Sequence, residues 1–226
     1  MYKEMEAALG VTFQDRRLLR LAFTHRSYVY ETPGAELATN ERLEFLGDSI
    51  LALITADYLY RTFPALTEGE LTNVRAVLVR TETLAQFARD LELGKFLIMG
   101  KGEHNTHESP RVLASTFEAI LGAIYIDQGL DRVREFVLPR LEAIAGTVVE
   151  KRLFKDNKSL FQEIAQSQVS ITPSYRLVGQ EGPSHNREFT VEVLLGEQVA
   201  GRGQGRNKQS AEQEAALNAL QSRGWI

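Results

Sequence analysis

The chain has 226 residues, with 26 basic against 30 acidic side chains and a formal net charge of −4, which does not by itself favour nucleic-acid binding. Hydrophobic residues make up 43% and charged residues 25%, which excludes a wholly disordered or fibrous chain. The absence of cysteine excludes disulfides, thiolate zinc sites and cysteine nucleophiles. The most apolar stretch, residues 113–126, is too short for a membrane span, so we expect a cytoplasmic protein without membrane contact.

Two domains are expected from the change in hydrophobic pattern along the chain. Residues 1–149 show helical spacing and predict an all-α domain, and the polar residues 150–156 predict a linker. Residues 157–226 contain period-2 runs and predict a small α+β domain of order α-β-β-β-α. The expected helices of the first domain are 15–30, 40–61, 70–91, 111–126 and 131–149. The expected elements of the second are a helix at 159–168, strands at 174–179, 187–195 and 197–202, and a helix at 208–222.

The charge is divided unevenly between these two parts. Residues 1–150 hold 16 basic and 22 acidic side chains, whereas residues 151–226 hold 10 and 8. The first part is therefore acidic and the second slightly basic, so any contacts with phosphate are expected in the second part.

Three acidic residues lie on one side of the helix that is expected at 40–61. Glu41, Glu44 and Asp48 stand at i, i+3 and i+7. A solvated acidic edge is one interpretation of this pattern. However, Gly47 lies between them, and glycine inside a helix costs about 1 kcal/mol relative to alanine, which indicates close approach by another group.

Glu118 is the single charge within the apolar run 113–125, which lies in the helix expected at 111–126. A buried carboxylate needs a partner or a metal ion. An ion pair with Arg42 or Arg111 is one interpretation. The other begins from Gly122, one turn later, which allows close contact with a second helix.

If these two helices cross near Gly47 and Gly122, then Glu44, Asp48 and Glu118 converge. Clustered carboxylate oxygens suit Mg²⁺ or Mn²⁺. Such an ion lowers the pKa of water and neutralises charge on a phosphoryl group. The sequence therefore predicts a site for divalent-cation chemistry on phosphate.

Three motifs resemble those of bacterial ribonuclease III. They are NERLEFLGDS at 40–49, LAFTHRSY at 21–28 and FEAILG at 117–122, and the likeness extends from end to end of the chain. The resemblance implies an endoribonuclease that cleaves double-stranded RNA by water attack, leaving 5′-phosphate and 3′-hydroxyl ends. It also implies processing of rRNA precursors and other structured RNAs, dependence on Mg²⁺ with Mn²⁺ as a substitute, and a homodimer.

The resemblance also assigns roles to single acidic residues. Glu44, Asp48 and Glu118 fall on metal-binding positions of the family, and Asp48 and Glu118 are expected to be catalytic. Glu41 matches another acidic position of the active site, and Glu68 matches one implicated in processing.

Two of these assignments have a structural alternative. Glu68 lies in a segment where Thr67 and Glu70 have the spacing of a helix-capping box. Phe45 resembles an aromatic residue at the family's dimer interface, and its alternative is ordinary core packing.

Ser115 departs from the family pattern, which has aspartate at this metal-binding position. A hydroxyl can contact a cation but brings no negative charge. Two outcomes stay open. Either the remaining carboxylates hold the metal more weakly and cleavage survives at higher Mg²⁺, or the chain binds double-stranded RNA with little or no cleavage.

Residues 157–226 resemble a double-stranded RNA-binding domain, which reads the shape of the A-form helix. Its first helix is expected to offer polar side chains to the minor groove, and a loop containing His185 is expected to enter a second groove. The candidate residues of this helix are Ser159, Gln162, Glu163 and Gln166.

A second RNA contact is expected at the helix that begins near residue 208. Asn207 can cap this helix, and Arg206 and Lys208 lie at its N-terminus, where free N–H groups favour phosphate oxygens. The family has a second lysine where this chain has Gln209.

The remaining histidines are interpreted as structural. His25 lies in the upstream motif, and His104 and His107 lie in a polar loop that we do not interpret as a metal site.

Overall fold

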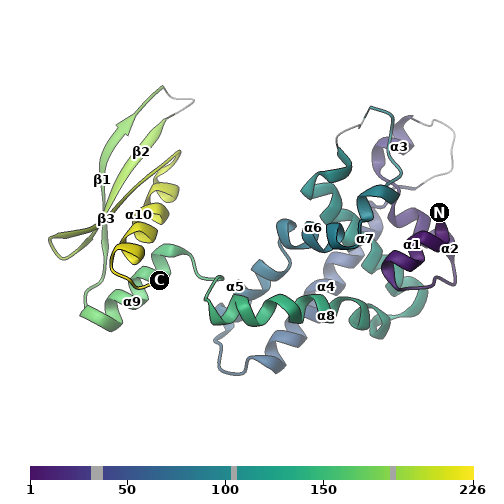
Figure 1. Cartoon of the computed structure of the whole chain (residues 1–226), viewed down its shortest axis with the longest axis horizontal. Helices are drawn as coiled ribbons and strands as arrows, with labels where there is room; N and C mark the ends of the chain where they lie inside the picture. Colours follow the sequence, from purple (N-terminus) through teal and green to yellow (C-terminus); the bar gives the residue numbers. More distant parts are fainter. Residues whose placement is uncertain (32–37, 103–105, 184–186) are drawn as a thin grey trace. The chain divides into compact units, whose positions relative to one another are not determined.

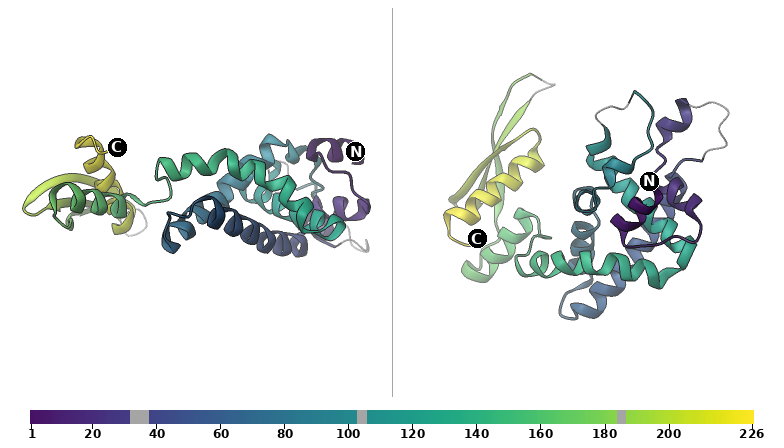
Figure 2. Two further views of the ribbon diagram at one scale, coloured as in Figure 1. Left: turned by 90° about the horizontal axis from the view of Figure 1, so that it is seen from below. Right: turned by 45° about the vertical axis from the view of Figure 1, so that its right-hand side comes forward.

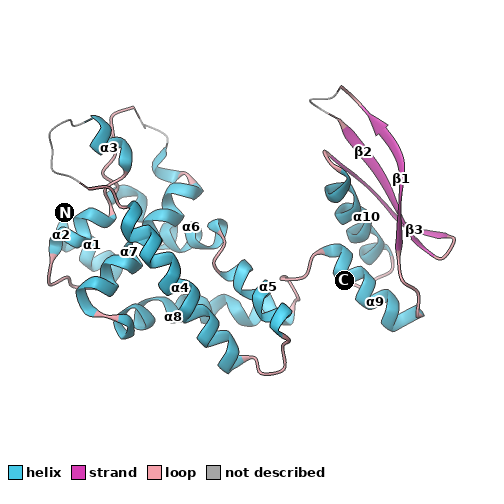
Figure 3. Cartoon of the chain, turned by 180° about the vertical axis from the view of Figure 1, so that it is seen from behind, coloured by secondary structure: helices cyan, strands magenta, loops and turns pink. Residues whose placement is uncertain are grey.

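The structure is a computed structural model, and it describes residues 1–31, 38–102, 106–183 and 187–226. The chain divides into two compact units, Met1–Phe154 and Lys155–Ile226, each with its own hydrophobic core. The division falls within the residues 150–156 that were expected to form a linker. The expected fold class, an all-α domain and an α-β-β-β-α domain, is confirmed in the described residues (Figure 3).

The described part of the first unit is built from helices. They are α1 (Tyr2–Leu9), α2 (Arg16–Ala22), α3 (Arg26–Glu31), α4 (Glu41–Thr62), α5 (Glu68–Leu78), α6 (Thr81–Asp90), α7 (Pro110–Gln128) and α8 (Leu130–Glu150), with short 3₁₀ helices η1 (Leu93–Phe96) and η2 (Thr106–Glu108). The central helix is α7, which contacts α2, α4, α6 and α8 (Figures 1 and 2). Its apolar residues are buried on several sides, as expected of a helix that other helices surround.

Two expected helices are each divided in the structure. The helix expected at 15–30 is interrupted because the N–H of Ile98 donates to the carbonyl of Phe23 and the N–H of His25 donates to the carbonyl of Ile98, at 2.9 and 3.0 Å. The helix expected at 70–91 is interrupted at Arg80, whose backbone is extended. This break allows α5 to pack on α4 and α8 while α6 packs on α7. Helix α1 was not predicted from the sequence.

None of the helices in the described ranges combines the length and the apolar character needed to cross a bilayer.

The second unit contains α9 (Asn157–Val169), β1 (Ser174–Glu181), β2 (Glu188–Leu195), β3 (Gln198–Gly205) and α10 (Lys208–Ser222). The three strands form an antiparallel sheet in the order β1-β2-β3, and α10 packs along β2 and β3 and contacts α9 (Figure 1). The glycines of β3 allow this packing. A Cβ on Gly203 would lie 2.2 Å from the backbone nitrogen of Ala215, and one on Gly201 would lie 2.5 Å from the carbonyl oxygen of Ala215. These glycines therefore bring the strand against the helix.

Candidate functional site

The helices α4 and α7 touch through their backbones at two glycines. A Cβ on Gly47 would lie 1.8 Å from the carbonyl oxygen of Glu118, and one on Gly122 would lie 2.3 Å from the carbonyl oxygen of Leu43. No larger residue fits either position without movement of the backbone. The close crossing that the sequence predicts from these glycines is therefore present in the structure, and it brings the acidic face of α4 against α7.

A cavity of about 650 Å³ opens where these helices meet. From α4 come Glu41, Glu44 and Asp48, and from α7 come Ser115 and Glu118. The cavity is also lined by His25, Arg26, Asn40, Phe45, Thr106, Ser109, Arg111 and Val112.

Glu68 does not line this cavity. It is the first residue of α5, and one of its carboxylate oxygens accepts a hydrogen bond from Thr72 at 3.2 Å. On either side of it, Thr67 and Glu70 form the capping box that their spacing indicates. A role for Glu68 in cleavage stays a prediction.

Negative charge accumulates around Glu118. Burial of its side chain, with further contributions from Asp48 and Glu44, raises the pKa of Glu118 to about 7. Neither Arg42 nor Arg111 forms an ion pair with it in the described structure. The alternative interpretation, in which an arginine neutralises Glu118, is therefore not found in the described structure. A bound cation would relieve the repulsion of Glu118 by Asp48 and Glu44.

Ser115 is tied to this group of carboxylates. Its hydroxyl donates to Oε1 of Glu44 at 2.8 Å. The hydroxyl thus occupies one oxygen of a carboxylate that was expected to bind the metal, and it adds no charge of its own.

The oxygen atoms of these side chains have the chemistry that a hard divalent cation prefers. Within the described residues, however, no three histidine or carboxylate side chains form a ready-made group for a metal ion. Mg²⁺ usually retains several waters and needs only one or two protein carboxylates, so this donor set fits such an ion without a closed protein cage.

Phe45 is exposed, with 76% of its surface accessible, and borders the cavity from α4. Its predicted alternative, burial in the core of its own unit, is wrong because the side chain lies on the outer side of the helix.

Neither Arg26 nor Arg111 was predicted to be a site residue of this cavity, and Arg111 was considered only as an ion-pair partner of Glu118. For Arg111 a signal was present, since Arg111, Ser115 and Glu118 stand at i, i+4 and i+7 and share one face of α7. For Arg26 no local signal exists, because the packing of α3 decides its position. His25 also lines the cavity, and its Nδ1 lies 2.8 Å from the hydroxyl of Ser27.

Residues 15–144, which include both glycines of the helix crossing, match the family described as Ribonuclease-III-like. The chain is also 47% identical to a protein of Oceanobacillus iheyensis named Ribonuclease 3, over 97% of each chain. The chain belongs to the ribonuclease III family. The resemblance of its three sequence motifs is thereby confirmed.

Other members of the ribonuclease III family support this assignment. A Ribonuclease 3 of Nitratiruptor is 44% identical over 96% of this chain and 95% of its own. A solved structure of the nuclease domain of ribonuclease III from Campylobacter jejuni aligns with a TM-score of 0.58 and 36% identity, covering 63% of this chain and 97% of that one. That structure is described as showing flexibility in a region involved in dimer formation.

A second family match lies in the second unit of this chain. Residues 157–223 match the family described as double-stranded RNA binding motif. On α9, Gln162 is exposed, Gln166 donates to the hydroxyl of Thr172 at 3.1 Å, and Glu163 pairs with Lys155. The hydroxyl of Ser159 donates to Asp156, the residue that caps α9.

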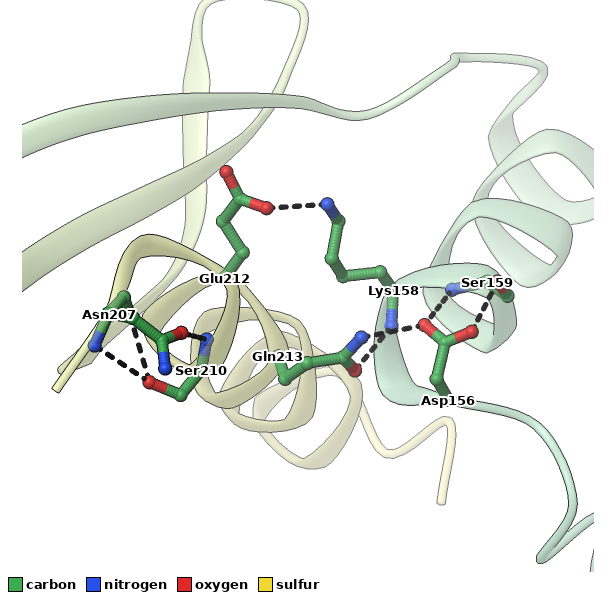
Figure 4. A network of polar contacts seen from close by, with 7 residues as sticks. All are labelled: Asp156, Lys158, Ser159, Asn207, Ser210, Glu212 and Gln213. Atoms are coloured by element: carbon green, nitrogen blue, oxygen red, sulfur yellow. Dashed lines mark hydrogen bonds and ion pairs between the residues drawn. The ribbon is translucent and has the colours of Figure 1, made fainter. Parts of the chain in front are cut away.

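Polar contacts join the beginning of α9 to α10 (Figure 4). Lys158 pairs with Glu212 at 2.5 Å, and the side-chain amide of Gln213 donates to Asp156 at 2.9 Å. These contacts fix the position of α9 relative to α10. Both helices were expected to contact RNA.

Asn207 caps α10 as the sequence predicts. Its side-chain oxygen accepts from the N–H of Ser210 at 2.8 Å, and the hydroxyl of Ser210 accepts from the N–H of Asn207 (Figure 4). Beside this cap, Arg206 and Lys208 are exposed, and neither forms an ion pair with a described residue. Both cations are therefore available to phosphate. The expected contact at His185 lies outside the described residues, as does His104.

We expect Asn207→Ala to lower the free energy of unfolding of the second unit by about 1 kcal/mol, because α10 loses its cap. Trp225 is the only tryptophan of the chain and packs on Phe161 in this unit, so its fluorescence during urea unfolding reports on this unit alone. Asn207→Ser retains a capping oxygen and should stay close to the parent. Equal midpoints for the two variants would contradict the role of the cap.

Proposed function

We propose that this chain is an endoribonuclease that hydrolyses phosphodiester bonds of double-stranded RNA. The observation that carries the proposal is the convergence of Glu44, Asp48 and Glu118 from two helices in one cavity, in a chain that also has a double-stranded RNA binding motif. The targets include rRNA precursors and other structured RNAs, and the site of action is the cytoplasm. The domains are 1–149 and 157–226, joined by 150–156.

The three carboxylates would hold Mg²⁺, or Mn²⁺ in its place. When bound, such an ion would supply Lewis-acid chemistry, since it lowers the pKa of water and neutralises charge on a phosphoryl group. Glu44 and Asp48 contribute oxygens from successive turns of α4, and Glu118 contributes from α7. Asp48 and Glu118 are also the catalytic carboxylates, with Glu41 at the same cavity, and the products carry 5′-phosphate and 3′-hydroxyl ends. Glu68 acts in processing from outside this cavity.

A second copy of the chain covers the exposed side of α4 around Phe45. The side chain of Phe45 has 76% of its surface accessible, and burying this apolar surface against a partner is favourable. Two-fold symmetry then presents two equivalent sites to the two strands of a duplex, which accounts for a pair of cuts.

The second unit binds the duplex by its shape. The polar side of α9, with Ser159, Gln162, Glu163 and Gln166, contacts the minor groove. Arg206, Asn207 and Lys208 contact phosphates at the beginning of α10, and His185 contacts a second groove.

The test is cleavage of a long RNA duplex in a series of Mg²⁺ and Mn²⁺ concentrations, followed on gels. We expect the parent to cut, and Ser115→Asp to lower the Mg²⁺ concentration for half-maximal rate by about 3- to 10-fold, because a fourth carboxylate joins the site. Ser115→Ala is the matched control, since it removes the hydroxyl without adding charge, and it should not lower this concentration.

Intact RNA with the parent under every metal condition, together with cleavage by Ser115→Asp, would establish the alternative of a double-stranded RNA-binding protein without cleavage. That alternative is not favoured, since relatives named Ribonuclease 3 align with nearly the whole chain.

A further inference from the structure

The cavity between α4 and α7 is lined by side chains of both charges. The acidic ones include Glu44, Asp48 and Glu118, which the proposed cleavage uses. Its two arginines are Arg26 and Arg111, to which the carboxylate chemistry gives no role. Two guanidinium groups in the same cavity as these carboxylates suggest that the arginines bind anionic groups of the substrate itself.

Arg111 stands on the same helix as the catalytic carboxylate. Arg111, Ser115 and Glu118 share one face of α7, and seven residues of helix separate Arg111 from Glu118 by about 10 Å along the axis. Its side chain is exposed and forms no ion pair with any described carboxylate. A phosphate group that enters the cavity therefore meets a cation that is not paired with any carboxylate of the described residues.

Arg26 approaches the cavity from the beginning of α3. Its ion pair with Glu41 is 3.9 Å long, and both side chains are more than half exposed. Such a pair contributes little to stability, so exchanging Glu41 for a phosphate costs little. A guanidinium group can also donate two parallel hydrogen bonds to one phosphate, which is stronger and more directional than a single contact.

We propose that Arg111, assisted by Arg26, is a positioning residue that binds backbone phosphates of the RNA strand next to the phosphodiester that is cleaved. The carboxylates would hold the cation, and the arginines would hold the RNA strand. This inference rests on the proposed function and adds to it the groups that fix the position of the strand. The sequence suggested Glu118 as one possible ion-pair partner of Arg111. In this proposal the partner of Arg111 is a backbone phosphate of the substrate.

The test compares Arg111→Ala, Arg111→Lys and Arg89→Ala in the full chain. Arg89 lies on α6 and is exposed, and it does not line the cavity, so Arg89→Ala is the matched loss of one positive charge. Binding of a labelled RNA duplex is measured in EDTA over a series of KCl concentrations, and KM and kcat are measured with Mg²⁺.

We expect Arg111→Ala to weaken binding and raise KM by about 3- to 10-fold, with a smaller change in kcat. The slope of log affinity against log salt should fall by about one unit for each lost phosphate contact. Arg111→Lys should recover most of the salt slope but less of the affinity, because the ammonium group keeps the charge and loses the paired hydrogen bonds.

An Arg111→Ala variant with the same KM and salt slope as Arg89→Ala, in a preparation whose parent cleaves RNA, would overturn this inference while leaving the proposed function intact. If the parent does not cleave, the proposed function fails. The salt series in EDTA still decides whether Arg111 contacts phosphate.

Discussion

Gly47→Ala is expected to destabilise the first unit by about 3 kcal/mol or more, because the new methyl group would lie 1.8 Å from the carbonyl oxygen of Glu118. If the neighbouring atom belonged to a side chain, that side chain could rotate away from the methyl group. Here the neighbouring atom belongs to the backbone of α7, so the contact is relieved only if α4 moves away from α7. The same movement separates Glu44 and Asp48 from Glu118, so cleavage should fall further than stability alone explains. Urea unfolding followed by the circular dichroism of the helices measures the first effect, and cleavage rates in native conditions measure the second.

Gly69→Ala is the matched control for this substitution. Gly69 lies in the first turn of α5, and a Cβ there meets no atom within 4 Å. Alanine should therefore stabilise this helix by about 0.4–1 kcal/mol, because it restricts the unfolded chain and favours helix. If the two variants unfold at the same urea concentration, the close crossing of α4 and α7 does not exist in solution.

The helix crossing and the main site residues could be predicted from the sequence because their signals are local. Glu44 and Asp48 are one turn apart, Gly47 is costly in a helix without a packing reason, and Glu118 is a lone charge in the apolar run 113–125. Each of these observations concerns one helix, and together they restrict how the two helices can pack.

Other features depend on residues that are distant in sequence. The break between α2 and α3 exists because Phe23 and His25 bond to Ile98, which no pattern within residues 15–30 reveals. The position of Arg26 in the cavity follows from that break, since α3 takes a direction that a continuous helix would not. One of the two interpretations of Glu118, an ion pair with Arg42 or Arg111, is not present in the described structure, and only the packed structure shows which charges face each other.

Glu118→Gln is expected to stabilise the metal-free protein at pH 8 and to abolish most of its cleavage. Burial and the neighbouring carboxylates raise the pKa of Glu118 from an ordinary 4.5 to about 7 in the folded state. The folded state therefore binds this proton more tightly than the unfolded state does, and stability is lost as the pH rises from about 4.5 through about 7. Glutamine carries no charge at any of these pH values, so the variant should lack this loss.

The expected gain in the free energy of unfolding in EDTA at pH 8 is about 1–2 kcal/mol, discounted because water reaches part of the side chain and screens the repulsion. Adding Mg²⁺ should raise the melting temperature of the parent and have less effect on the variant, since ligand binding to the folded state stabilises it. Cleavage should fall by about 10²- to 10³-fold.

Glu82→Gln is the control for Glu118→Gln, since Glu82 is an exposed carboxylate of α6 outside the cavity, and it should change stability by less than about 0.5 kcal/mol and leave cleavage unchanged. The gain in stability and the loss of activity at Glu118 have opposite signs, which a residue with a purely structural role would not produce. A Glu118→Gln protein that is less stable than its parent in EDTA at pH 8 would mean that this carboxylate is satisfied within the fold, and that the repulsion among the three acids does not exist.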